Sequence, residues 1–160
     1  MILGIDPGLA NCGFAVIETG NENLETRINL VEAGVWISKS QENDVDRLKK
    51  IYLELEKIIK KYKVDRIAVE RLFFARNVSS ALPVAEVIGV IKVCGANLGV
   101  EVVTYTPLQI KMALVGYGRA EKYQVEEMVR QSLSLEKPIS PSHAADAVAA
   151  ALTDLFTMRL

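Results

Sequence analysis

The sequence predicts an α/β fold in which one mixed sheet of five strands is flanked by helices on both faces. The first 37 residues contain short apolar runs separated by turn residues, as in strands that pair through hairpins. The rest of the chain alternates amphipathic stretches of helical period with short apolar runs. A hairpin-rich start followed by strand–helix–strand crossovers gives a sheet with antiparallel and parallel parts, which helices cover on each side.

Three strands are expected near the N-terminus. Residues 2–5 form an apolar run that the turn sequence Asp6-Pro7-Gly8 ends, and residues 12–17 follow closely enough to pair with it. We expect the polar segment 18–27 to be a turn region and residues 31–37 to be the third strand.

The central part is expected to alternate helix and strand. From Val45 to Tyr62, apolar residues recur at three- and four-residue steps, which predicts a helix with one buried stripe. Residues 66–69 are an apolar run typical of a buried parallel strand, and Glu70 ends it. The last strand is expected at residues 101–105.

The remaining segments have helical patterns. We expect helices at residues 108–114 and 121–133, separated by Gly116-Tyr117-Gly118, and a final helix from about residue 140 to about residue 158. A further helix is expected before the last strand, from about residue 80 to about residue 98.

The helix at about 80–98 is apolar nearly all round. One face must cover the sheet, so a second apolar face remains, with Val87 and Ile91 as expected outward positions and Gly89 and Gly95 leaving room for a partner backbone. We therefore expect a two-fold homodimer that buries this face against its own copy. The alternative is that the C-terminal helices cover it within one chain.

Composition and charge limit the class of protein. The 160 residues have the length of one domain, so residues 1–160 are expected to form a single domain. The net charge of −1 means that a nucleic-acid partner would have to bind a local cluster of Lys and Arg. We recognise no cleavable leader or membrane span, and Cys12 and Cys94 lack metal or disulfide spacing, so we expect a soluble, cytoplasmic protein with buried, reduced thiols.

Two carboxylates follow strands that are expected to be neighbours. Asp6 ends the first strand and Glu70 ends the first parallel strand, so both would emerge at one edge of the sheet, where ligands of open α/β sheets bind. A carboxylate at a strand end is also common as a solvated turn residue. For Asp6 alone, before Pro-Gly, that interpretation would be favoured.

The last helix changes this balance. His143 and Asp146 stand in a stretch that is otherwise alanine and valine, and three-residue spacing puts them on one helical face. A lone histidine is usually structural, but an unpaired charge on so apolar a helix is expensive. Together with the two strand-end carboxylates, the pair favours a metal site. Carboxylates and imidazole suit Mg²⁺ or Mn²⁺, and two such ions can clamp a phosphodiester.

Four blocks of sequence stand out when taken together. They are Leu3-Gly4-Ile5-Asp6-Pro7-Gly8 with Gly13-Phe14-Ala15-Val16, then Ala68-Val69-Glu70-Arg71-Leu72-Phe73, then Pro107-Leu108-Gln109-Ile110-Lys111 with Gly116-Tyr117-Gly118-Arg119-Ala120-Glu121-Lys122-Tyr123-Gln124-Val125, and last His143-Ala144-Ala145-Asp146-Ala147. In this order, and over essentially the whole chain, they resemble the RuvC-type Holliday junction resolvases. Sugar kinases and actin-like ATPases share the first block alone, whereas the four together are specific.

The resemblance implies a homodimeric, Mg²⁺-dependent endonuclease of RNase H-like fold. Such an enzyme nicks two strands of like polarity across a four-way DNA junction during recombination and repair, and its partners are a branch-migration complex of junction-binding protein and helicase. Asp6, Glu70, His143 and Asp146 would hold the metal, two ions per site. His143 stands where many members carry Asp and others carry His, which makes the site less negative by one charge.

The resemblance also implies residues that contact DNA. Lys111 and Lys122 match the functional lysines of the family, although solvated surface is the usual place of a lysine. Phe73 is placed to stack on an unpaired base at the junction centre, with a place in the core as the alternative. Basic residues beside the carboxylates are expected to bind phosphates, namely Arg71, Arg76, Lys111, Arg119 and Lys122.

Three other functions fit parts of the sequence. An actin-like ATPase needs a second, equivalent domain that 160 residues cannot supply. A resolvase-like ribonuclease acting on RNA precursors would use the same fold and carboxylates, and the block from Gly116 to Val125 with Phe73 favours the junction resolvase over it. A non-catalytic nucleic-acid-binding module would have no need of three carboxylates beside phosphates.

Overall fold

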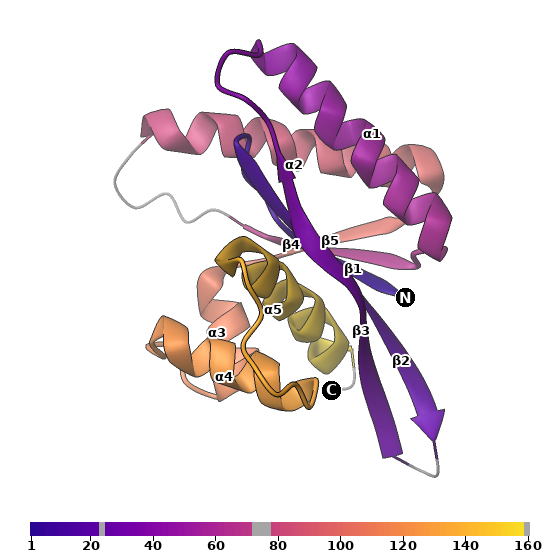
Figure 1. The fold of residues 1–160 in the computed structure, drawn as a ribbon, viewed down its shortest axis with the longest axis vertical. Helices are drawn as coiled ribbons and strands as arrows, with labels where there is room; N and C mark the ends of the chain where they lie inside the picture. The colour runs from indigo at the N-terminus through magenta and orange to yellow at the C-terminus, as the bar shows by residue number, and fades with distance from the viewer. Residues whose placement is uncertain (23–24, 72–77, 159–160) are drawn as a thin grey trace.

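A computed structural model describes residues 1–22, 25–71 and 78–158. Its strands form one mixed sheet in the order β3-β2-β1-β4-β5 (Figure 1), in which β1 pairs antiparallel with β2 and parallel with β4. The predicted α/β class and mixed sheet are confirmed. The strands are β1 (Ile2–Asp6), β2 (Asn11–Glu22), β3 (Glu25–Ile37), β4 (Arg66–Glu70) and β5 (Glu101–Tyr105).

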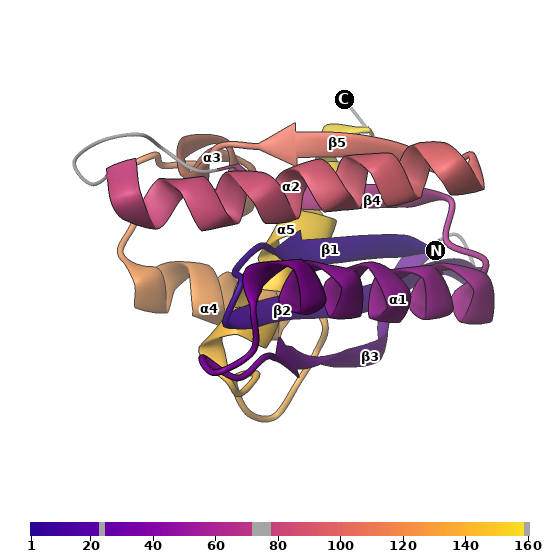
Figure 2. The ribbon, with the colours of Figure 1, turned by 90° about the horizontal axis from the view of Figure 1, so that it is seen from above.

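Helices cover both faces of the sheet, as predicted. On one face α1 and α2 lie side by side (Figure 2) and enclose a core with Leu3, Ile5 and Ile67. On the other face α5 packs on the strands and α3 and α4 pack against it. The helices are α1 (Asp44–Tyr62), α2 (Val78–Leu98), α3 (Pro107–Val115), α4 (Lys122–Ser132) and α5 (Ser142–Thr157).

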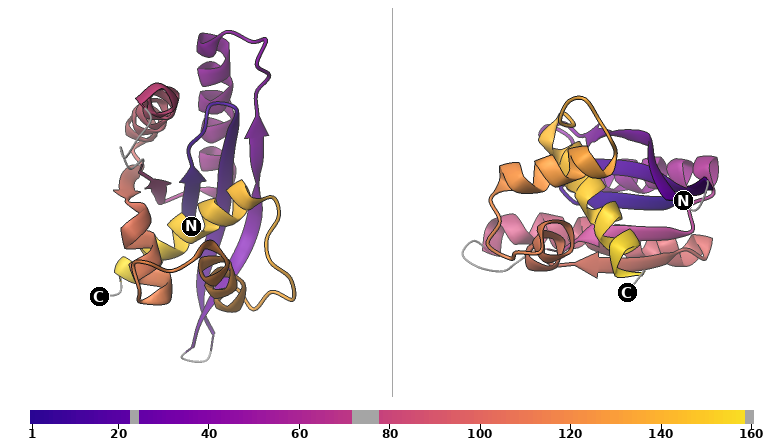
Figure 3. Two further views of the ribbon diagram at one scale, coloured as in Figure 1. Left: turned by 90° about the vertical axis from the view of Figure 1, so that its left-hand side faces the viewer. Right: turned by 90° about the horizontal axis from the view of Figure 1, so that it is seen from below.

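The expected turn at residues 18–27 is wrong. Strands β2 and β3 continue as an antiparallel pair through this segment, with Thr19 opposite Ile28 and Asn21 opposite Thr26. Backbone hydrogen bonds and cross-strand contacts hold such a ladder even where most side chains are polar. Apolar content was therefore a poor guide to where the strands end. Figure 3 shows this hairpin extending beyond the rest of the sheet.

The orientation of α2 also differs from expectation. Val87 and Ile91 are 0% exposed, and a Cβ on Gly95 would lie 2.4 Å from the Val102 side chain, so all three face the core. The outward face instead carries Leu82 and Val93, which are 60% and 56% exposed. With apolar residues all round, periodicity gave no means of telling one face from the other.

By length and composition alone, Ala81–Leu98 would also pass as a membrane-spanning helix. In this fold it packs on the sheet and on α1 through a buried stripe that includes Cys94. Both Cys94 and Cys12 are buried free thiols, as predicted.

Two glycines let α5 lie directly on the sheet. A Cβ on Gly4 of β1 would stand 1.9 Å from the Ala147 carbonyl oxygen, and one on Gly13 of β2 would stand 2.1 Å from that of His143. Any side chain at either position would push the helix away. Because α5 crosses the strands obliquely (Figure 3), the contact at Gly13 brings its N-terminal end, with His143, over the end of β1.

Candidate active site

The strand-end carboxylates lie at one edge of the sheet. β1 and β4 are parallel neighbours with Ile5 opposite Val69, so the next residues, Asp6 and Glu70, leave the sheet side by side. This confirms the expected juxtaposition. Both carboxylates are half-buried and line the same pocket with His143 and Asp146 of α5.

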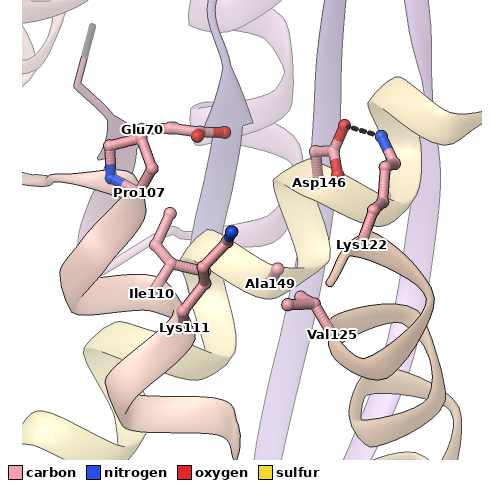
Figure 4. Close-up of a pocket in the computed structure, with 8 residues that line it drawn as sticks. All are labelled: Glu70, Pro107, Ile110, Lys111, Lys122, Val125, Asp146 and Ala149. Carbon is pink, nitrogen blue, oxygen red and sulfur yellow. Dashed lines mark hydrogen bonds and ion pairs between the residues drawn. The ribbon is translucent and has the colours of Figure 1, made fainter. Parts of the chain in front are cut away.

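Three of the four expected ligands converge. Ligand atoms of Asp6, His143 and Asp146 all lie within 4.8 Å of one another, and His143 Nδ1 is 2.7 Å from Asp6 Oδ2. Glu70 lies outside that group. It lines an adjoining pocket together with Asp146, and Figure 4 shows the two carboxylates on opposite sides of that pocket. Carboxylate oxygens with one imidazole are donors that suit a hard divalent cation, so the cluster fits such an ion.

Both predicted lysines line the pocket that Glu70 and Asp146 share. Lys122, at the start of α4, donates a hydrogen bond to Asp146 Oδ2 at 2.9 Å, and this contact raises the pKa of the lysine. Lys111 enters from α3 (Figure 4). The position of α3 follows from its N-terminus, where Thr106 and Gln109 form a capping box directly after β5. Two lysine side chains, from α3 and α4, therefore line the same pocket as the two carboxylates.

The carboxylates destabilise one another's charges. Burial, and then the negative charges of Asp6 and Asp146, raise the pKa of Glu70 from 4.5 to about 7, while Lys122 opposes the shift. Burial is also the first cause that raises the pKa of Asp6. A bound cation would relieve both effects, because it favours the ionised form.

We expect the metal-free protein to lose stability as the pH rises from about 5 to about 8. The folded state holds the Glu70 proton up to a pKa of about 7, whereas the unfolded chain releases it near 4.5, so the folded state binds more protons in between. The loss should be on the order of 2 kcal/mol. Urea unfolding in EDTA at both pH values measures it. Glu70→Gln should remove most of this dependence, and an unchanged dependence in that variant would contradict the assignment.

The arginine and aromatic predictions have mixed outcomes. Arg71 lines the pocket with the carboxylates, and its backbone N–H donates to the Tyr105 carbonyl at 2.7 Å. Arg119 is exposed between α3 and α4 and lines neither of the two pockets. Phe73 and Arg76 lie outside the described residues.

Apolar wall residues of the site were missed from the sequence. Pro107, Ile110 and Val125 line the pocket that holds Lys111 and Lys122. One signal was available, because Pro107 follows β5, a parallel strand that ends at the same sheet edge as β4. The helical residues carried no such signal, since their side chains look like ordinary core.

Comparison with known proteins decides the family. A sequence model described as "Crossover junction endodeoxyribonuclease RuvC" matches residues 2–154. The chain belongs to the RuvC family. A RuvC from Heliobacterium modesticaldum is 45% identical over 153 residues, which cover 95% of this chain and 91% of that protein.

Solved RuvC structures share the whole fold. The Thermus thermophilus RuvC structure has a TM-score of 0.92 at 34% identity, covering 99% of this chain and 95% of that one. The same protein in complex with a Holliday junction substrate has a TM-score of 0.91 at 35% identity, covering 99% and 94%. The RNase H-like fold and the crossover junction endodeoxyribonuclease activity expected from the sequence are confirmed. Nothing in these matches supports the alternative of a ribonuclease.

Proposed function

We propose that this chain resolves Holliday junctions by paired, metal-dependent nicks in strands of like polarity, during recombination and repair. The observation that carries this proposal is the convergence of Asp6, His143 and Asp146, facing Glu70 and flanked by two lysines, in a member of the RuvC family. A similar structure in complex with a Holliday junction substrate supports the choice of DNA.

The four residues Asp6, Glu70, His143 and Asp146 would hold Mg²⁺, or Mn²⁺ in its place, with two ions per site. When bound, such ions stabilise negative charge on the entering and leaving oxygens of a phosphodiester. If His143 carries its proton on Nδ1, that N–H donates to Asp6 Oδ2, and the lone pair on Nε2 remains available to a metal. Asp6 thus orients the imidazole as well as contributing its own oxygens.

The lysines supply positive charge where the phosphate would lie. Asp146 holds Lys122, and Lys111 projects from α3 into the same pocket, so both side chains line the pocket with Glu70 and Asp146. Preorganised charge of this kind stabilises the transition state without reorganising during the reaction. Arg71 would bind a neighbouring phosphate. The assigned DNA contacts of Phe73, Arg76 and Arg119 stay predictions, as do the branch-migration partners, the cytoplasmic location and the single-domain organisation.

The chain would act as a two-fold homodimer, because a junction presents two matched strands. The exposed face of α2 that carries Leu82 and Val93, with open space around Gly89, is the surface that a second copy would cover. The proposed interface is on the helix expected from the sequence, but its outward residues are Leu82 and Val93 and not Val87 and Ile91.

Val93→Glu is expected to yield a folded monomer that nicks a junction but loses paired incision. A charge that replaces an apolar side chain is costly to bury in an interface, so association should weaken by at least about 2 kcal/mol. Sedimentation at micromolar concentration and the fraction of junctions cut in both strands measure the two effects. Leu53→Glu, at an exposed position of α1, is the matched control. A wild-type protein that sediments as a monomer would refute the dimer.

A panel of substrates tests the proposed function. A synthetic four-way junction should be nicked in Mg²⁺, whereas a linear duplex of the same arm sequence and its RNA counterpart should be left largely intact. Preferential cleavage of the RNA would replace the proposal with a ribonuclease activity.

A further inference from the structure

The most deeply buried charge in the described part of the chain lies far from the metal ligands. Asp154 of α5 is 0% exposed. Arg66 of β4 approaches it with two donors, Nε at 2.9 Å from Oδ2 and Nη2 at 3.0 Å from Oδ1. Tyr105 of β5 donates its hydroxyl to Oδ1 at 2.7 Å. Asp154 is thus bound by three donors from two adjacent strands.

This network specifies how α5 is oriented relative to β4 and β5. A buried ion pair adds little net stability over apolar residues of the same volume, because desolvation offsets the attraction. A two-pronged guanidinium–carboxylate contact, by contrast, is satisfied in one relative orientation only. Burial, and then the hydrogen bond to Asp154, raise the pKa of Tyr105 to about 12, so the phenol keeps its proton and remains a donor.

The same secondary-structure elements carry metal ligands at their other ends. β4 runs from Arg66 to Glu70, a span of roughly 13 Å along a strand. On α5, Asp154 lies roughly 12 Å along the helix from Asp146. The network therefore ties α5 to β4 near Asp154, and the His143–Asp6 contact ties the N-terminal end of α5 to the neighbouring strand β1.

Between these two places α5 contacts the sheet through apolar groups. At the crossing with β1, Gly4 faces the Ala147 backbone and the Ala151 methyl group. Val148 and Leu152 of α5 lie in one core with apolar residues of β1 and β2. Apolar contacts allow close approach but are not directional, so they specify the slide and rotation of the helix less precisely than paired hydrogen bonds do. Movement there would displace His143 and Asp146 at the N-terminal end relative to the strand that carries Asp6.

We infer that Arg66, Asp154 and Tyr105 form a positioning clamp, which fixes the slide and rotation of α5 so that His143 and Asp146 meet Asp6. The clamp touches no reacting atom, so its residues position the ligands and are not catalytic. The consequence for metal binding rests on the proposed function, whereas the consequence for the His143–Asp6 contact does not.

The test uses Asp154→Asn and Tyr105→Phe in the full chain. His143 is the one histidine of the sequence, so the ¹⁵N resonances of its imidazole report the contact with Asp6 without ambiguity and without metal. The Mn²⁺ affinity, measured by calorimetry without DNA, is the second readout. Ile58→Val and Ile58→Ala, in the buried face of α1, are the controls that lower stability on the other side of the sheet.

We expect Asp154→Asn to shift the His143 resonances at fixed pH and to weaken Mn²⁺ binding by roughly tenfold, as for residues that orient metal ligands. Tyr105→Phe should shift the His143 resonances and weaken Mn²⁺ binding to a smaller extent. If Asp154→Asn does not fold, the Tyr105→Phe variant is the test of the clamp. Neither Ile58 variant should move the resonances. Unchanged His143 resonances in a folded clamp variant, or equal shifts in the Ile58 variants, would overturn the clamp. A wild-type protein that does not bind Mn²⁺ would refute the metal site alone.

Discussion

Asp6→Asn is expected to lower Mg²⁺-dependent nicking of a four-way junction by on the order of a thousandfold, equal to roughly 4 kcal/mol of lost transition-state stabilisation. The side chain keeps its shape and loses the charge that would hold a cation beside His143 and Asp146. Junction binding should stay within about threefold of wild type, because the carboxylate repels DNA phosphates and its loss removes no favourable contact. Single-turnover cleavage and a gel-shift titration measure the two quantities.

Glu70→Gln and Asp146→Asn should give the same combination of lost cleavage and retained binding. Glu18→Gln, an exposed carboxylate on β2, is the control that changes net charge equally without touching the site. Substantial nicking by Asp6→Asn in Mg²⁺ would contradict the assignment of the ligands. His143→Asp should remain active with an altered preference between Mg²⁺ and Mn²⁺, since it restores a carboxylate. A poorly soluble product would instead indicate a structural histidine.

Lys122→Ala is expected to lower the single-turnover rate by on the order of a hundredfold while changing junction affinity much less. The reason is its position, since Asp146 holds its ammonium group in the pocket where the phosphate would lie. Lys111→Ala should behave in the same way if it also reaches the scissile phosphate. If it holds a neighbouring phosphate, it should instead weaken binding and reduce the salt slope by about one.

Rate and affinity measured over a series of salt concentrations separate these roles. Lys137→Ala, an exposed lysine outside both pockets, is the control. If both lysine variants keep the wild-type rate and affinity, Lys111 and Lys122 are ordinary solvated surface residues with no role in binding or cleavage.

The sequence predicted the parts of the site that depend on strand order and helical spacing. Asp6 and Glu70 end parallel neighbouring strands, so their place at one edge follows from strand order alone. The His143–Asp146 face follows from helical spacing. That His143 also contacts Asp6 depends on how closely α5 approaches the sheet, and the small residue that permits it, Gly13, shows no such role in the sequence.

Other features could not be predicted because they depend on tertiary packing. A helix that is apolar all round does not reveal which side meets the sheet, so Val87 and Ile91 were assigned to the wrong face. The polar arms of β2 and β3 extend through backbone pairing, which leaves no apolar pattern. The partners of the buried Asp154 are Arg66 and Tyr105, which are 88 and 49 residues away in the sequence. No local pattern links such positions.

Mapping of the nicks on a four-way junction labelled in each strand shows whether this protein resolves junctions by paired incision. In Mg²⁺ we expect two opposite strands of like polarity to be cut at symmetric positions, and DNA ligase to seal the resulting ends. EDTA should abolish both cuts. Cuts that persist in EDTA, or that fall in one strand without a matching cut in its opposite, would contradict paired, metal-dependent incision.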